Sequence, residues 1–236
     1  MADSTKKHPD IKVIIPAFNE ADSIAEVIGD LPDFVSEIIV VNNNSSDKTF
    51  RNAQSAGATV LNEERRGYGY ACLKGMDHIA RQSKPPDIIV FIDGDYSDYP
   101  EELNKVVAPI LDKDYDLVIG ARVERLREKG SMTPQQVFGN WLATLLMKWF
   151  FGGTFTDLGP FRAIKYDRLL RLGMEDKTYG WTVEMQLKAI KRNLRYTEVA
   201  VHYRKRIGVS KVSGTVKGSI FAGIKILGWI FKYSVK

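Results

Sequence analysis

Two aspartates separated by one glycine, Asp93-Gly94-Asp95, are the residues of this chain whose types and spacing point most directly to chemistry. They follow the apolar run 88–92, which is typical of a buried strand. Carboxylates one residue apart can both turn towards one hard cation, and Mg²⁺ prefers such a pair together with substrate phosphates. The motif therefore predicts Mg²⁺ or Mn²⁺ bound to a diphosphate. The alternative is an Asp-Gly turn with solvated acids.

Short runs rich in isoleucine and valine recur through the first half of the chain and predict parallel strands buried on both faces. They cover residues 12–15, 37–41, 59–61, 88–92 and 117–119. Apolar residues at helical spacing lie between them, in 24–31 and 103–110. This alternation predicts an α/β fold with an open, doubly wound, mostly parallel sheet.

Polar clusters stand at the carboxyl ends of these strands, where ligands bind in open α/β sheets. Besides the Asp93 motif they are Pro16-Ala-Phe-Asn-Glu20, Asn42-Asn-Asn-Ser-Ser-Asp47 and Gly120-Ala-Arg122. We expect the four clusters to meet at one edge of the sheet. That edge is the predicted active site.

The second half of the chain is less regular. Residues 121–135 are charged and aperiodic and predict a mobile loop, followed by an apolar helix near 136–151. Strands are expected near 161–164 and 196–201, with a helix near 181–192 between them. A basic loop over 204–213 then leads into a final helix, roughly 215–232.

Composition narrows the class of protein. The chain has 236 residues, 44% apolar and 27% charged, which predicts one globular domain and no long disorder. A single cysteine, Cys72, and an N-terminus without an apolar leader favour a cytoplasmic protein. No apolar run approaches the ~18 residues of a membrane span, and no Gly-x-x-x-x-Gly-Lys-Ser/Thr motif of a P-loop nucleotidase occurs.

The positive charge is concentrated at the C-terminal end. Residues 201–236 hold eight lysines and arginines and no acid, although the net charge of the whole chain is only +5. In the final helix Lys217, Lys225 and Lys232 share one side, and apolar residues occupy the rest. We expect this helix to lie in a membrane interface, with its lysines towards anionic headgroups and Trp229 at the boundary. The alternative is packing against the apolar helix near 137–151.

Several motifs together resemble the family 2 glycosyltransferases of GT-A fold. They are Ile14-Ile-Pro-Ala-Phe-Asn-Glu20, the stretch 40–49, Arg66-Gly-Tyr-Gly-Tyr-Ala71 and Asp93-Gly-Asp95. Four further segments, 120–122, 156–162, 180–186 and 206–211, are similar to the dolichol-phosphate mannose synthase-like branch. The resemblance spans about residues 11–220. It implies a nucleotide-sugar half (11–122), an acceptor half (123–214) and a membrane-proximal amphipathic helix (215–236).

The resemblance also implies roles for individual residues. Asp93 and Asp95 would hold the metal, and Arg122, Arg162, Asp157 and Glu184 would be catalytic residues near the transferred group. The donor would be bound by Pro16, Ala17, Glu20, Asn43, Gly67, Asp93, Gly94, Arg206 and Lys211. From the residues alone, Asp157 could equally be a turn residue, Glu184 a solvated helix residue, and 204–211 a solvated basic loop.

The reaction implied is metal-dependent, inverting transfer of a hexose from GDP-mannose or UDP-glucose to a polyprenyl phosphate at the cytoplasmic membrane face. Related enzymes often carry spanning helices, so peripheral attachment or a membrane partner subunit is expected here, and nucleic acid is not. Asn42-Asn43 stand where the family usually has two aspartates, which leaves the preferred base open. The alternatives are transfer to a hydroxyl of a lipid, saccharide or small molecule, a sugar-nucleotide pyrophosphorylase, and a non-catalytic membrane-binding module.

Overall fold

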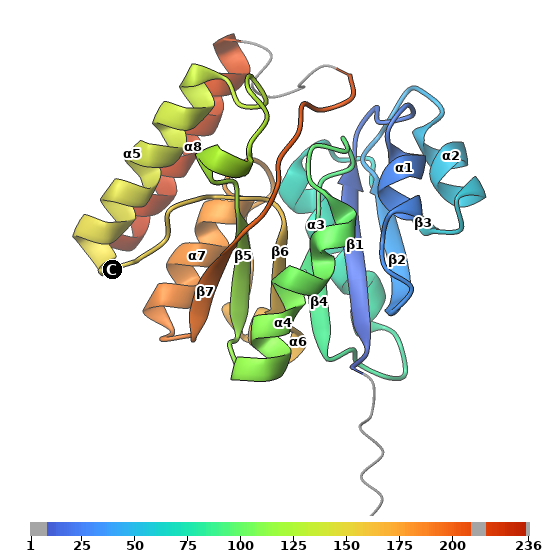
Figure 1. Cartoon of the computed structure of the whole chain (residues 1–236), viewed down its shortest axis with the longest axis horizontal. Coiled ribbons are helices and arrows are strands. Elements are labelled where there is room, and N and C mark those ends of the chain that lie inside the picture. Colours follow the sequence, from blue (N-terminus) through green and yellow to red (C-terminus); the bar gives the residue numbers. More distant parts are fainter. Residues whose placement is uncertain (1–8, 209–215, 235–236) are drawn as a thin grey trace, which may run out of the picture.

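A seven-stranded sheet with helices on both faces forms the body of the protein (Figure 1). The computed structural model describes residues 9–208 and 216–234, the side chains of 216–222 excepted. The strands are β1 (Ile11–Ala17), β2 (Val35–Asn42), β3 (Thr59–Asn62), β4 (Ile88–Phe91), β5 (Leu117–Ala121), β6 (Arg162–Lys165) and β7 (Tyr196–Ala200). Their order is β3-β2-β1-β4-β6-β5-β7. Only β6 runs antiparallel to its neighbours β4 and β5, so the predicted mostly parallel α/β fold is confirmed.

Successive residues of the central strands face opposite layers, as the pleat requires. Val13 and Ile15 of β1 pack under α1 (Ile24–Gly29) and α4 (Leu103–Lys113). Ile14 between them packs with α3 (Tyr68–Ala80), α6 (Tyr166–Leu172) and α7 (Trp181–Lys191). The strands therefore carry continuous apolar runs rather than an alternating pattern.

The prediction from the sequence missed several short helices and turns. No helix was predicted at α2 (Thr49–Ser55) or at α6, because seven residues give barely two turns of periodicity. The charged segment 121–135, predicted as a mobile loop, contains the 3₁₀ turn Glu124–Leu126, and the Glu128 N–H donates to the Tyr203 carbonyl (2.8 Å). A second 3₁₀ turn, Pro100–Glu102, precedes α4.

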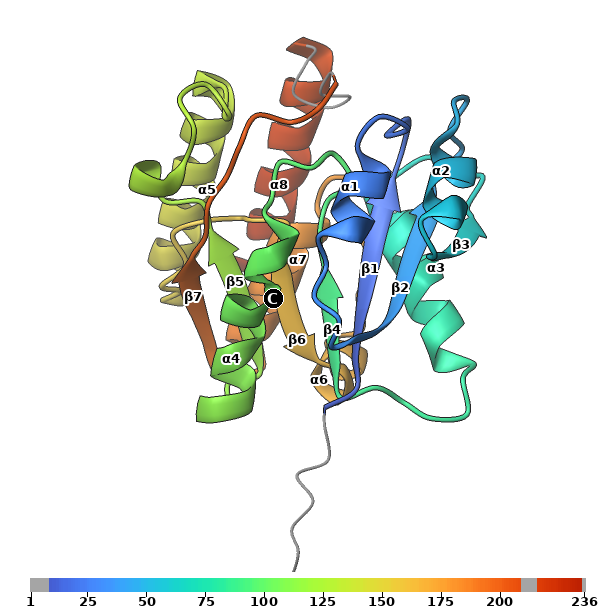
Figure 2. The same ribbon diagram turned by 45° about the vertical axis from the view of Figure 1, so that its right-hand side comes forward.

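Two long helices, α5 (Pro134–Phe151) and α8 (Val216–Ser234), lie side by side at one end of the sheet (Figures 1 and 2). A capping box starts α5, in which Thr133 accepts from the Gln136 N–H and Gln136 accepts from the Thr133 N–H. Gly152, with φ 68°, ends it in the left-handed conformation that favours glycine. None of the helices in the described part of the chain is long and apolar enough to cross a membrane.

The lysine side of α8 turns towards the protein body, which corrects the predicted orientation. Lys225 pairs with Asp176 (3.3 Å) and Lys232 with Glu175 (3.7 Å). Trp229, expected at a membrane boundary, is 7% exposed and donates its indole N–H to Asp176 (2.6 Å). The acidic loop before α7 thus attracts these groups, and packing of α8 against α5 is the arrangement found. The side chain of Lys217 lies outside the described residues.

A partly buried ion pair between β1 and β2 gives a test of the fold. Lys12 of β1 donates to Glu37 of β2 (2.8 Å), and Gln82 donates to the same carboxylate (2.9 Å). Burial alone would raise the pKa of Glu37, but the hydrogen bonds from Lys12, Gln82 and His78 outweigh it and lower the pKa to about 2.

Because the pKa of Glu37 is lower in the folded chain than in the unfolded one, its stabilising effect is complete above about pH 4.5 and is lost as the pH falls towards 2. We therefore expect Glu37→Gln to lower the melting temperature at pH 7, and the difference from wild type to shrink below pH 4. Thermal melts followed by circular dichroism measure this. The exposed Glu64→Gln serves as control, and a difference that stays constant with pH would contradict the assignment.

Candidate active site

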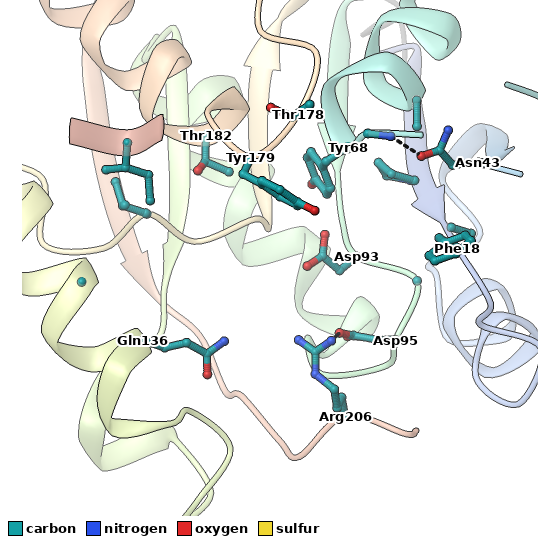
Figure 3. Close-up of a pocket in the computed structure, with 18 of the residues that line it drawn as sticks. Phe18, Asn43, Tyr68, Asp93, Asp95, Gln136, Thr178, Tyr179, Thr182 and Arg206 are labelled. Atoms are coloured by element: carbon teal, nitrogen blue, oxygen red, sulfur yellow. Dashed lines mark hydrogen bonds and ion pairs between the residues drawn. The ribbon is translucent and has the colours of Figure 1, made fainter. Parts of the chain in front are cut away.

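A cavity of about 620 Å³ opens at the carboxyl edge of the sheet, where the four polar clusters meet. The predicted site residues that line it are Pro16, Ala17, Glu20, Asn43, Gly67, Asp93, Gly94, Asp95, Arg122 and Arg206. They come from the ends of β1, β2, β4 and β5, from the start of α3 and from the segment after β7. Figure 3 shows Asp93, Asp95 and Arg206 on one side of this space and Gln136 of α5 across from them.

The two aspartates differ in their surroundings. The Asp95 carboxylate accepts from the N–H (3.0 Å) and hydroxyl (2.5 Å) of Ser97 and pairs with Arg206 (2.8 Å). Oδ1 of Asp93 is buried and has no hydrogen-bond partner among the described residues. Burial, with a further contribution from the Asp95 carboxylate, raises the pKa of Asp93 to about 6. Two acids thus lie close together, and one positive side chain, Arg206, is paired with Asp95.

This donor set fits a divalent cation. An unpartnered buried carboxylate oxygen beside a second carboxylate is costly without a positive charge, and oxygen donors of this kind are the ligands of Mg²⁺ and Mn²⁺. The Arg206 guanidinium supplies part of that charge in the structure. Within the described residues, no three or more acidic, histidine or cysteine side chains gather into a metal cage. Two protein carboxylates together with ligand phosphates are an arrangement that Mg²⁺ accepts.

Asn43 and Gly67 shape the cavity wall near the ends of β1 and β2. The Asn43 amide donates to the carbonyls of Glu63 (3.2 Å) and Arg65 (2.7 Å), and its oxygen accepts from the Gly67 N–H (2.8 Å). An aspartate could not donate these bonds, so the departure from two aspartates has a structural use. A Cβ at Gly67 would lie 2.2 Å from the Lys177 carbonyl, and its φ is 149°, so only glycine fits there.

Arg122 and Asp157 form a buried pair at the end of β5. The Asp157 carboxylate accepts from Arg122 Nε (2.8 Å), Nη2 (2.7 Å) and backbone N–H (2.8 Å). Burial would raise the pKa of Asp157, but the Arg122 charge outweighs it and the pKa is lowered. Arg122 lines the cavity and Asp157 lies behind it. Asp157 is therefore placed to hold Arg122, and both of its oxygens are engaged.

Arg162 and Glu184 do not line the cavity. Arg162 is fully buried and donates to the carbonyls of Leu158, Gly159 and Thr182. The Glu184 carboxylate is also fully buried. It accepts from the N–H groups of residues 175 and 176 (both 2.8 Å) and pairs with Lys188 (2.7 Å). The structure thus gives these two predicted catalytic residues supporting positions, because their polar atoms are used to hold loops. Lys211 lies outside the described residues.

The segment that carries Arg206 is tied down along the Asp93–Asp98 loop. Arg204 N–H donates to the Ser97 carbonyl (2.9 Å), and Ile207 N–H donates to the Asp95 carbonyl (3.0 Å). The Arg204 guanidinium lies over two aromatic rings, with its Cζ 3.4 Å from the ring centroid of Tyr96 and 4.1 Å from that of Tyr99. Arg204 and Arg206 of the predicted basic loop are therefore engaged with the protein, and Arg206 lines the cavity, whereas Lys205 is exposed.

Sequence reasoning missed the contribution of four helices to the cavity wall. The cavity is also lined by Tyr68, Met132, Gln135, Gln136, Gly139, Asn140, Thr182, Gly223 and Ile226, from α3, the start of α5, α7 and α8. The capping-box pattern Thr133…Gln136 was a signal that a helix begins at this point.

The prediction from the sequence also missed Asp98. It is 1% exposed with no partner for either carboxylate oxygen among the described residues, and burial raises its pKa well above the ordinary value.

Comparison with known sequences gives concordant matches. A sequence model of glycosyl transferase family 2 matches residues 12–172. An uncharacterized glycosyltransferase of Mycobacterium tuberculosis is 34% identical over 220 residues, covering 90% of this chain and 94% of the relative. An undecaprenyl-phosphate mannosyltransferase of Micrococcus luteus is 28% identical over 93% of each chain. A dolichyl-phosphate hexose transferase of Haloferax volcanii is 27% identical, over 89% of this chain and 90% of the relative.

Among solved structures, glucosyl-3-phosphoglycerate synthase from Mycobacterium tuberculosis has a similar fold. The complex of that protein with Mn²⁺, UDP-glucose and phosphoglyceric acid superimposes with a TM-score of 0.76 at 20% identity. The match covers 96% of this chain and 80% of that one. At this identity the likeness establishes the fold, and the expected GT-A architecture is confirmed.

Proposed function

The chain belongs to glycosyltransferase family 2, and from that premise we propose that it transfers a hexose from a nucleotide sugar to a polyprenyl phosphate. The observation that carries the proposal is the grouping of Asp93, Asp95, Arg122 and Arg206 around one cavity. Two carboxylates for a cation and two guanidinium groups for phosphates suit a diphosphate donor and a phosphate acceptor. Relatives named for undecaprenyl-phosphate and dolichyl-phosphate transfer support this acceptor class.

Each group of residues around the cavity would have its own role in the transfer. Mg²⁺ or Mn²⁺, held by Asp93 and Asp95, would offset the charge that develops on the leaving nucleoside diphosphate. Pro16, Ala17 and Asn43 form the wall at which the nucleoside would bind. Arg206, which pairs with Asp95, would exchange that partner for a phosphate oxygen, and Arg122, which Asp157 holds, would orient the acceptor. Attack of the acceptor on the face opposite the leaving group gives inversion.

The state of Asp157 favours a phosphate acceptor over a hydroxyl. A hydroxyl must lose a proton to a base as it attacks, whereas a phosphate monoester is already largely ionised, its second pKa being about 6. Both oxygens of Asp157 are engaged by Arg122, and a lowered pKa makes it a weak base. A phosphate acceptor needs orientation and screening, which Arg122 and Arg206 can supply.

The test is to incubate the protein and Mg²⁺ with radiolabelled GDP-mannose or UDP-glucose and undecaprenyl or dolichyl phosphate, then to extract the lipid. Label in the organic phase, dependent on metal and on the lipid phosphate, is the expected result and names the donor. Label in a water-soluble product formed with phosphoglyceric acid or another hydroxyl acceptor, and none in the lipid, would replace the proposal with the alternative acceptor class.

Peripheral membrane attachment is part of the proposal, through a surface different from the lysine side of α8. Here α5 and α8 expose large apolar side chains that we call the aromatic face: Val137, Phe138, Trp141, Trp149, Phe150, Ile224 and Phe231. Trp149 is 72% exposed and Phe138 60%. Exposed apolar groups gathered on two neighbouring helices are typical of a protein or membrane interface. A membrane is the proposed occupant because the acceptor is a lipid.

We expect the double variant Trp149→Ser/Phe150→Ser to lose at least tenfold in vesicle binding. Burying each side chain contributes about 1.5–3 kcal/mol, and 1.4 kcal/mol is a factor of ten. Flotation with phosphatidylcholine vesicles, with and without anionic lipid, measures it. Leu170→Ser, an exposed position on α6, is the matched control. If wild type and the double variant float equally, the aromatic face does not bind lipid. Failure of wild type to float would instead leave this face to a membrane partner subunit.

A further inference from the structure

The hydroxyl of Tyr68 is a buried polar atom at the cavity wall that the proposed function leaves without a role. Tyr68 is the first residue of α3 and lines the cavity. Its hydroxyl oxygen is buried and has no hydrogen-bond partner among the described residues. Buried polar atoms of folded proteins are nearly always hydrogen-bonded, so this hydroxyl requires an explanation.

The surroundings of Tyr68 hold it in one place. The next residue, Gly69, donates its N–H to the Thr178 carbonyl (3.3 Å). A Cβ at Gly69 would lie 2.0 Å from the Asp176 carbonyl oxygen, so the start of α3 packs directly on the backbone of this loop. The Tyr68 ring also packs against the hydrophobic core. A side chain fixed in this way is suited to orient another one.

Asp93 is the strong hydrogen-bond acceptor near the Tyr68 hydroxyl. Burial raises the pKa of the Tyr68 phenol well above its ordinary value, and the Asp93 and Cys72 side chains raise it further, whereas Arg162 lowers it. A thiol is a weak acceptor and a guanidinium has no acceptor atom, which leaves the Asp93 carboxylate. Figure 3 shows the Tyr68 side chain directed towards Asp93. The phenol is protonated at neutral pH and is therefore a donor.

The two predicted metal ligands are supported unequally. The Asp95 carboxylate is held by Ser97 and Arg206, whereas Oδ1 of Asp93 is buried without a partner among the described residues. Burial is the main cause of the raised pKa of Asp93, and the Tyr68 hydroxyl lowers this pKa, as a nearby hydrogen-bond donor does. The two groups therefore lie beside each other, although their atoms do not meet hydrogen-bond geometry in the structure.

We propose that Tyr68 is a positioning residue for the cation site, whose hydroxyl donates to Oδ1 of Asp93 and leaves the other carboxylate oxygen to face the cation. Hydrogen bonds from neighbouring residues orient the carboxylates that bind metals, and losing one typically lowers metal affinity 10–100-fold. The inference rests on the proposed function for the cation itself. It extends that function because it assigns the orientation of Asp93 to a residue outside the Asp93–Asp95 motif.

The test is Tyr68→Phe, which removes the hydroxyl and keeps the ring. In Mn²⁺ titrations followed by electron paramagnetic resonance, its Kd for Mn²⁺ should be at least about tenfold higher than that of wild type. Tyr70→Phe is the matched control. Tyr70 lies on the same helix, its ring contacts Arg65 and Lys177, and it does not line the cavity. This variant should keep the affinity of wild type.

Thermal melts in EDTA distinguish positioning from a structural role. Tyr68→Phe should melt at the temperature of wild type or above it, because the hydroxyl that it removes has no partner to lose. A lower melting temperature in EDTA, together with unchanged Mn²⁺ affinity, would give Tyr68 a structural role and overturn the inference.

The lipid transfer assay separates this inference from the proposed function. If Tyr68→Phe weakens Mn²⁺ binding but wild type transfers no sugar to lipid, the proposed function fails and the role of Tyr68 stands. If wild type makes the lipid product but both tyrosine variants bind Mn²⁺ as wild type does, the inference is wrong. Loss of affinity for the nucleoside diphosphate at saturating Mn²⁺, with Mn²⁺ affinity unchanged, would assign the hydroxyl to the donor instead.

Discussion

Asp95→Asn and Asp93→Asn should each lower kcat by at least about 10²-fold, because each removes a charge that a divalent cation and a leaving diphosphate require. The Asp93 substitution leaves a buried oxygen without its charge, and the Asp95 substitution also removes the partner of Arg206. Treatment with EDTA should abolish transfer in wild type, and Mg²⁺ or Mn²⁺ should restore it. Initial rates at saturating donor measure the effect.

A second readout keeps this prediction independent of turnover. Mn²⁺ bound to the protein, followed by electron paramagnetic resonance, should be lost in both variants and retained in Asp112→Asn, an exposed acid at the end of α4. Circular dichroism at pH 7 checks that the variants fold. Full activity of either variant, or Mn²⁺ binding unchanged in both, would show that the cation and the diphosphate are held elsewhere. The assignment of the whole site would then fail.

Asp157→Asn should destabilise the protein by about 3–5 kcal/mol, the cost of removing one partner from a buried ion pair. The side chains of Arg122 and Asp157 are 10% and 7% exposed, so water screens the uncompensated Arg122 charge poorly. Because the pKa of Asp157 is lowered by folding, its contribution is present above the ordinary aspartate pKa of about 4 and is lost as the pH falls further. Urea unfolding at pH 7 gives the change in free energy.

The double variant Arg122→Gln/Asp157→Asn separates the ion pair from other effects. If the pair acts as described, the two losses in stability are far from additive, and the double variant is more stable than the sum predicts. In transfer assays Arg122→Gln and Asp157→Asn should reduce phosphate transfer alike, since Asp157 acts through Arg122. A much larger effect of Asp157→Asn on transfer to a hydroxyl acceptor would instead identify Asp157 as a base.

The predicted sheet and the convergence of the four polar clusters were readable from local sequence. Runs such as 88–92 are apolar at every position because both faces of the strand are covered. Such a run can be recognised in the sequence without knowing which helices pack on it. Parallel strands bring their carboxyl ends to one edge, so Asn43, Asp93 and Arg122 had to meet there. The roles given to individual site residues stay predictions until the variants are measured.

The orientation of elements and side chains that contact residues distant in the sequence could not be predicted from local patterns. The orientation of α8 is decided by Glu175 and Asp176, which draw Lys232, Lys225 and Trp229 inward across some fifty residues of sequence. A helical wheel of α8 shows only the residues of that helix, and Glu175 and Asp176 lie outside it. The lysine side was therefore predicted to face a membrane. Glu184 likewise takes its place from backbone N–H groups of the preceding loop.

The α/β class, the family and the edge of the sheet predicted to carry the active site follow from the amino-acid sequence, because hydrophobic periodicity and strand polarity are local properties. The pairing of Arg206 with Asp95, the pairing of Asp157 with Arg122, and the cavity wall and exposed aromatic face of α5 and α8 follow from the packing alone. These depend on which charges and surfaces the packing brings together, and a charged or apolar residue in a sequence does not name its partner.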